Sequence, residues 1–114
     1  MSKTYFIDID GTILRHRGSL TSILLDFGEV LPNVIQKLND WAIRGDRIII
    51  TTARPESMRQ HTINELEYNG IFYDQLIMGL NHGPRVVIND AKSEYEEMAI
   101  GITVDRNKGL GDVR

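Results

Sequence analysis

Two carboxylates stand two residues apart near the start of the chain, in the run Asp8-Ile9-Asp10-Gly11-Thr12. Side chains at this spacing project to the same side of an extended backbone. Carboxylates held so close repel one another and lose hydration, which is costly unless a cation lies between them. Because hard oxygen ligands favour magnesium, the pair predicts a Mg²⁺ site.

A second polar run, Thr51-Thr52-Ala53-Arg54-Pro55, lies between an apolar segment and a helical pattern. A hydroxyl, free backbone N–H groups and a helix N-terminus together make an anion site suited to phosphate. Arg54 adds a planar donor with a permanent charge. Taken alone, the two threonines fit a β-strand equally well. A third run, residues 89–92 (Asn-Asp-Ala-Lys), could bring another carboxylate to the same place.

The elements that must position these residues follow from the apolar pattern. The run from Thr4 to Ile9 is almost continuously apolar and predicts a strand buried on both faces, in the centre of a parallel sheet. Helical spacing runs from Leu31 to Gly45 and from Pro55 to Gly70. Further strands are expected at Arg47–Thr51, Tyr73–Met78, Arg85–Asn89 and Ile100–Val104. We expect a hairpin or short lid at Thr12–Val30 and a loosely held tail at Asp105–Arg114.

Alternation of strands and helices predicts an α/β fold, a three-layer α/β/α sandwich with a mainly parallel, Rossmann-like sheet. The 114 residues fit one domain, residues 1–114, without a separate cap domain. Ligands of such sheets bind beyond the carboxyl ends of the strands. Asp8, Thr52 and Asp90 all follow predicted strands, so we expect them at one rim.

Composition excludes several classes of function. Hydrophobic residues make up 41% and charged residues 25%, as in ordinary soluble domains. The net charge of −3 gives no support for nucleic-acid binding, and the absence of cysteine excludes disulfides and thiolate chemistry. No apolar run is long enough to cross a membrane, and the N-terminus does not resemble a secretory signal. These features favour a cytoplasmic protein with no membrane partner.

The motifs together resemble those of the haloacid dehalogenase (HAD) superfamily of phosphohydrolases, in its small capless form. Asp8 to Thr12 match the signature Asp-x-Asp-Gly-Thr without exception. Thr52-Ala53-Arg54 resembles the second motif, and Asn89-Asp90 resembles the acidic fourth motif with Asn in place of one Asp. The third motif is a Lys or Arg shortly before the fourth strand, for which Arg85 is one candidate and Lys92 the other.

The resemblance implies a magnesium-dependent phosphatase. Asp8 would attack phosphorus and form an aspartyl-phosphate, while Asp10 would act as general acid and then as general base. Magnesium would be held by Asp8, Asp90 and the backbone carbonyl of Asp10. Thr52, Arg54 and the basic residue of the third motif would bind the phosphate oxygens.

The two candidates for that basic residue rest on different arguments. The chain order of the family favours Arg85, which precedes its strand. Geometry favours Lys92, which follows the strand, because ligands gather at the carboxyl ends of parallel strands. Arg85 would serve if the strand is short or if the preceding loop folds over the rim.

Two rival functions are open on sequence grounds. A receiver domain also carries an acidic pair and a phosphorylated Asp, but its acceptor ends the third strand and the Asp-Gly-Thr continuation is missing there. A catalytically weak relative could serve as a binding or assembly module. For the enzyme, the expected partner is a small phosphorylated substrate, with a sugar phosphate as leading candidate. Capless relatives also complete their sites with a neighbouring subunit, so a homo-oligomer is a further candidate assembly.

Overall fold

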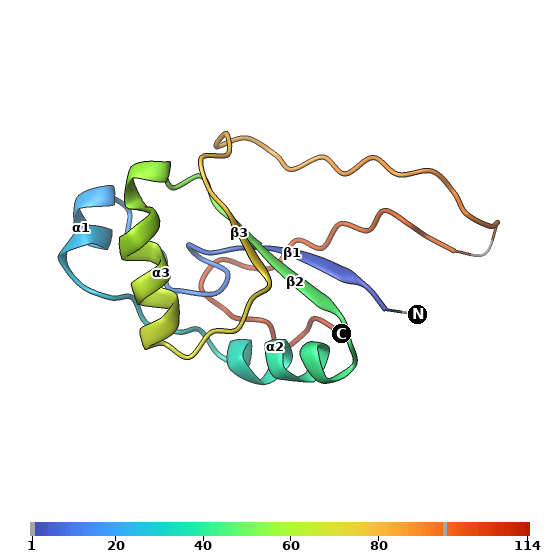
Figure 1. Ribbon diagram of the computed structural model, residues 1–114, viewed down its shortest axis with the longest axis horizontal. Coiled ribbons are helices and arrows are strands. Elements are labelled where there is room, and N and C mark those ends of the chain that lie inside the picture. Colours follow the sequence, from blue (N-terminus) through green and yellow to red (C-terminus); the bar gives the residue numbers. More distant parts are fainter. Residues whose placement is uncertain (1, 95) are drawn as a thin grey trace.

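The computed structural model describes residues 2–94 and 96–114. Its strands form a parallel three-stranded sheet in the order β1-β2-β3, so the α/β class with a parallel sheet is confirmed. Figure 1 shows the helices packed around this small sheet. In chain order the elements are β1 (Thr4–Asp8), α1 (Leu20–Leu25), α2 (Val34–Ile43), β2 (Arg47–Thr51), the 3-10 helix η1 (Glu56–Met58), α3 (Arg59–Tyr68) and β3 (Gln75–Ile77).

One face of the sheet carries the hydrophobic core. Ile7, Ile50 and Leu76 pair across the three strands, and all three side chains are buried. Helix α2 packs over this face, and its Trp41 ring stacks on Tyr5 with 3.9 Å between the ring centroids. The apolar side chains of α2 recur at helical spacing, which is why the sequence predicts this helix almost to its ends.

The opposite face of the sheet is more open. Side chains alternate between the faces of a strand, so Phe6, Ile49 and Gln75 form the neighbouring row and point the other way. Phe6 is 58% exposed in this row. The central position expected for the first strand is wrong, because β1 lies at an edge of the sheet.

Residues 81–103, called the arm below, leave the packed body and return to it (Figure 1). Every described residue of the arm is exposed except Met98. The strands expected at Arg85–Asn89 and Ile100–Val104 are therefore not formed in the described chain, since an extended segment becomes a strand only beside a partner. The arm makes the molecule 49 Å long against 28 and 24 Å in the other directions.

The C-terminal tail is held to the body, so the expectation of a loose tail is wrong. Leu110 and Val113 are buried in the core, and the Leu110 N–H donates to the Pro32 carbonyl at 3.1 Å. Gly109 has a φ of +81°, and a Cβ there would lie 2.0 Å from the Pro32 carbonyl oxygen. Two apolar side chains and one close backbone approach thus anchor a segment whose composition is mostly polar.

The segment 12–30 closes at its base like a hairpin, one of the two expected forms. Leu14 and Val30 make an antiparallel bridge, and the Arg15 N–H donates to the Glu29 carbonyl at 2.9 Å, as at the base of a hairpin. Helix α1 lies between these ends. Within the described residues, no helix has both the length and the apolar character needed to cross a bilayer.

Candidate active site

The site lies where β1 and β2 end. Asp8 pairs with Thr51 at the last position of the ladder, and the chain then turns sharply through Gly11. Gly11 has a φ of +91°, which a side chain would strain, and its N–H donates to the Leu14 carbonyl at 2.7 Å. This tight turn keeps Asp8 and Asp10 together at the rim, as the sequence predicts.

Asp8 is half-buried, and its surroundings disfavour its charge. Burial raises the pKa of Asp8 above its ordinary value, and the neighbouring Asp10 carboxylate raises it further. The backbone N–H of Ile9 and the guanidinium groups of Arg85 and Arg54 oppose this rise. The charged form of a carboxylate in such surroundings is stabilised by a nearby cation.

Arg54 does not point out of the protein toward solvent. Its side chain is buried and binds both oxygens of Asp10, with Nε to Oδ2 at 2.9 Å and Nη2 to Oδ1 at 2.8 Å. Its Nη1 donates to Glu65 Oε1 at 2.7 Å and to Thr62 Oγ1 at 3.1 Å. Burial disfavours the charged form, but the bonds to Asp10 and Glu65 outweigh it, so the pKa of Arg54 is raised. Arg54 therefore fixes the orientation of Asp10.

Glu65 is a site residue that the sequence-based interpretation missed. It is fully buried on α3 and also accepts from Arg17 Nη2 at 2.5 Å and from the Gly28 N–H at 2.7 Å. Asp10, Arg54, Glu65 and Arg17 thus form one chain of ion pairs, called the buried ion-pair chain below. Its sequence signal was the place of Glu65 on the inner face of the helix, three residues after Thr62. Arg17, from the segment before α1, belongs to this chain as well.

Thr52 is buried beside the end of β2. Its hydroxyl accepts the Arg54 N–H at 3.1 Å and keeps its own proton free to donate. Its backbone N–H is taken by the Ile77 carbonyl at 3.0 Å. Fewer backbone donors are therefore left for an anion than the sequence predicts.

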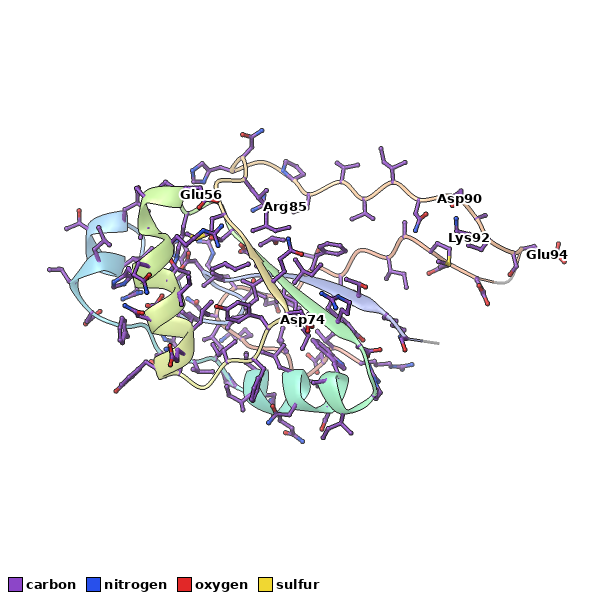
Figure 2. The ribbon with its side chains drawn as sticks, in the orientation of Figure 1. Glu56, Asp74, Arg85, Asp90, Lys92 and Glu94 are labelled. Carbon is purple, nitrogen blue, oxygen red and sulfur yellow. The ribbon has the colours of Figure 1, made fainter. Side chains whose placement is uncertain are left out.

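The structure places the two candidate basic residues far apart. Lys92 lies on the distal part of the arm and pairs with Asp90, whose side chain is 68% exposed (Figure 2). Arg85 lies at the root of the arm, near enough for its charge to act on Asp8. Its Nη1 is held by the carbonyls of Asn81 and Gly83 at 2.9 and 2.6 Å. The loop after β3 does pass along the rim, because the Gly79 N–H donates to the Arg54 carbonyl at 2.8 Å.

The described residues hold only part of the expected magnesium site. No group of three His, Cys, Asp or Glu side chains among them lies close enough to bind a metal ion. Asp8 and Asp10 provide oxygen donors of the kind that magnesium prefers. The third expected ligand, Asp90, stands on the distal part of the arm, away from the sheet (Figure 2).

Comparison with known proteins adds a fold but no family. No protein-family model matches the sequence, and a search of curated proteins finds no match. The structure is similar to the crystal structure of an MCSG target from Vibrio cholerae, with a TM-score of 0.53 and 22% sequence identity. The match covers 77% of this chain and 80% of that chain. At this identity the likeness concerns the fold alone.

Proposed function

We propose that the protein is a magnesium-dependent phosphatase that hydrolyses a phosphate monoester through an aspartyl-phosphate on Asp8, as its resemblance to HAD phosphohydrolases implies. The observation that carries the proposal is the pair at the carboxyl end of β1. Asp8 stands half-buried there, and Asp10 is fixed two residues on by two hydrogen bonds from a buried arginine. A nucleophile and a proton carrier held at one rim are what this reaction needs.

In the first step, a carboxylate oxygen of Asp8 attacks phosphorus and the bond to the leaving oxygen breaks. The leaving oxygen takes a proton from the carboxyl group of Asp10. Arg54 uses two of the roughly four lone-pair positions of the Asp10 carboxylate, so others remain to carry that proton. The Thr52 hydroxyl can donate to a phosphate oxygen as charge spreads over it.

In the second step, a water molecule attacks phosphorus, gives a proton to Asp10 and displaces the Asp8 carboxylate. Phosphate is released, and both side chains return to their starting states. Asp8, the Asp10 carbonyl and Asp90 are the oxygen ligands that would hold magnesium. When bound, magnesium offsets the repulsion between a carboxylate nucleophile and a phosphate anion.

We assign the basic phosphate ligand to Arg85 rather than to Lys92, because Arg85 lies near Asp8. The open rim suits an accessible phosphate, and a sugar phosphate is the substrate class we would test first. We also propose the full three-layer sandwich with a Rossmann-like sheet. This fold requires further elements beside β1 and over the face of the sheet that carries Phe6.

One observation favours a second function, a binding or assembly module without catalysis. Asp90 and Lys92 stand on the distal part of the arm, away from the sheet, and Arg54 already pairs with two carboxylates. A chain that stays in this arrangement would lack the third magnesium ligand.

Phosphate release separates the two functions. Wild-type protein with Mg²⁺ should release phosphate from one or more sugar phosphates, nucleotides or phosphopeptides. Asp8→Asn removes the attacking charge with little change of shape, so turnover should fall at least about a thousandfold while the fold persists. Asp40→Asn, at an exposed position on α2, is the matched control and should keep full activity. Activity of Asp8→Asn within a few-fold of wild type would reject the mechanism.

A further inference from the structure

The arm carries the pattern of a buried strand but lies in solvent. Val86, Val87 and Ile88 are 79, 52 and 91% exposed, and Ile100 and Ile102 on the returning leg are 56 and 59% exposed. Three consecutive apolar residues present apolar side chains on both faces of an extended segment, which suits a strand inside a sheet. Soluble proteins rarely leave such a segment uncovered.

The sheet offers a matching vacancy at the free edge of β1. In the described chain β1 pairs only with β2, although its own sequence is almost continuously apolar. Natural proteins commonly protect edge strands with charges, prolines or bulges, because an open edge recruits other strands. The described part of β1 carries none of these before Asp8. The unpaired arm therefore has the pattern of the strand that the free edge of β1 lacks.

The arm cannot fill this vacancy in its own chain with Asp90 at the rim. The Leu80 N–H is bonded to the Thr52 carbonyl at 3.1 Å on the side of β2 where β3 pairs, so the chain leaves the sheet at the carboxyl end of β3. If residues 85–90 ran parallel beside β1 with Asp90 at the rim, Arg85 would lie about five residues below the rim, roughly 16 Å down the sheet. It would also lie three strand positions from β3, roughly 14 Å across the sheet. That diagonal of roughly 21 Å exceeds the about 18 Å that the five residues from Leu80 to Arg85 span when fully extended.

The observed position of Arg85 leads to the same conclusion. The charge of Arg85 already acts on Asp8. Arg85 stands at the root of the arm (Figure 2), so the arm starts at the rim of its own sheet. A strand that starts at the rim and runs beside its own β1 would carry Asp90 to the opposite end of the sheet, roughly 16 Å away. In a second copy whose β1 runs the opposite way, the same strand would end at the rim.

We propose that two copies of this chain exchange arms, so that residues 81–103 of one copy extend the sheet of the other at the free edge of β1 and place Asp90 beside the Asp8 and Asp10 of that copy. The role of Asp90 rests on the proposed function, whereas the exchange itself rests on the arm and the edge. Exchange of an identical element is a common route to a two-fold dimer. The arm and the β1 edge together approach the roughly 20–30 residues per partner that stable interfaces use.

Molar mass tests the exchange without reference to activity. The full chain should sediment at twice its 13.0 kDa. Ile88→Asp places a charge where the arm would pair and should give a monomer. Ile43→Asp, at an 85% exposed position on α2, is the matched control and should stay dimeric. Since both side chains are exposed in the free chain, neither change should prevent folding, which circular dichroism checks.

A longer hinge tests the reach argument. Six Gly/Ser residues inserted between Gly83 and Pro84 would let the arm close on its own sheet, so this variant should be monomeric at concentrations where wild type is a dimer. The same insertion between Gly18 and Ser19, two exposed residues far from the arm in sequence, should leave the dimer intact. A wild-type monomer, or a dimer that the hinge insertion leaves unchanged, would overturn the exchange.

Mixed dimers test whether the arm completes the site. Asp8→Asn and Asp90→Asn chains, each nearly inactive alone, are refolded together and isolated as mixed dimers with two affinity tags. One of the two sites then combines an intact Asp8 with the partner's intact Asp90, so about half of wild-type activity should return. In the long-hinge background, mixing should restore nothing. Mixed dimers without activity would overturn the shared site, whereas an inactive wild-type dimer would reject only the proposed function.

Discussion

The buried ion-pair chain can be tested by the change Glu65→Gln, which keeps the shape of the side chain and removes its charge. Glu65 is fully buried, and it faces the Arg54 side chain, 1% exposed, and the Arg17 side chain, 15% exposed. Arg17 also pairs with Asp26 at 2.9 Å, but the Asp26 side chain is 78% exposed. The change therefore leaves Asp10 as the one carboxylate of the buried ion-pair chain for its two guanidinium groups. Breaking a buried pair in this way costs about 3–5 kcal/mol.

We expect the lower end of that range, because the amide oxygen can still accept one of the present hydrogen bonds. A loss of about 3 kcal/mol is a large part of the 5–15 kcal/mol that stabilises an ordinary domain. For a chain of this size it should lower the melting temperature by roughly 12 °C. It should also lower the urea midpoint with little change in the slope, by about 1–2 M.

The assay is urea unfolding followed by the fluorescence of Trp41, the single tryptophan of the sequence, which is 2% exposed and stacked on Tyr5. Measurements at one fixed protein concentration remove the effect of any association. Glu67→Gln, at an exposed position on the same helix, should change stability by less than about 0.5 kcal/mol. Equal midpoints for wild type and Glu65→Gln would show that the interior compensates the charges in another way, and the reasoning would fail.

Three further predictions concern the metal, acid stability and the tail. Chelation should abolish phosphate release and lower the melting temperature, and Mg²⁺ should restore both; full activity after exhaustive chelation would reject the magnesium site. Hydrogen bonding from the Lys3 N–H, reinforced by Arg44, lowers the pKa of Asp46. Its contribution to stability is therefore complete above the unfolded pKa of about 3.9 and disappears as the pH falls through the lower folded value, so Asp46→Asn should destabilise at pH 7 and much less in strong acid. A difference between the urea midpoints of wild type and Asp46→Asn that does not shrink in acid would contradict this. Gly109→Ala should cost at least about 2 kcal/mol in urea unfolding, whereas Gly83→Ala, with open space around it, should cost little; equal losses would contradict the close approach.

Sequence periodicity located the packed elements well. The second strand has the predicted bounds, the first is one residue shorter than predicted, and helix α2 ends before Gly45 as expected. These segments bury a regular stripe or run of apolar side chains, so local pattern and tertiary packing agree. The prediction of a loose tail was wrong, because Leu110 and Val113 are anchored by a backbone contact at Pro32 that the apolar periodicity does not reveal.

The candidate site was predictable where chemistry is local in sequence. Asp8 and Asp10 fall where their spacing puts them, since a short turn leaves the chain little freedom. The partner of Arg54 was not predictable, because an arginine side chain reaches as readily toward a buried carboxylate as toward a ligand. A glutamate on the inner face of α3 was the one hint that the guanidinium has an internal partner, and α3 presents Glu65 there beside Thr62.

The arm shows a limit of a different kind. The apolar residues from Val86 to Ile88 predict a strand that is buried on both faces, but in the described chain this segment is exposed and forms no strand. Periodicity does not state which edge the strand will join, or whether that edge belongs to the same copy. The hinge decides this, because the seven residues between the end of β3 at Ile77 and Arg85 are too few for a crossover, which ordinarily needs about a dozen residues. When a strand pattern follows so short a link from the rim of a parallel sheet, pairing between copies is favoured. The length of the link indicates this more strongly than the composition of the strand does.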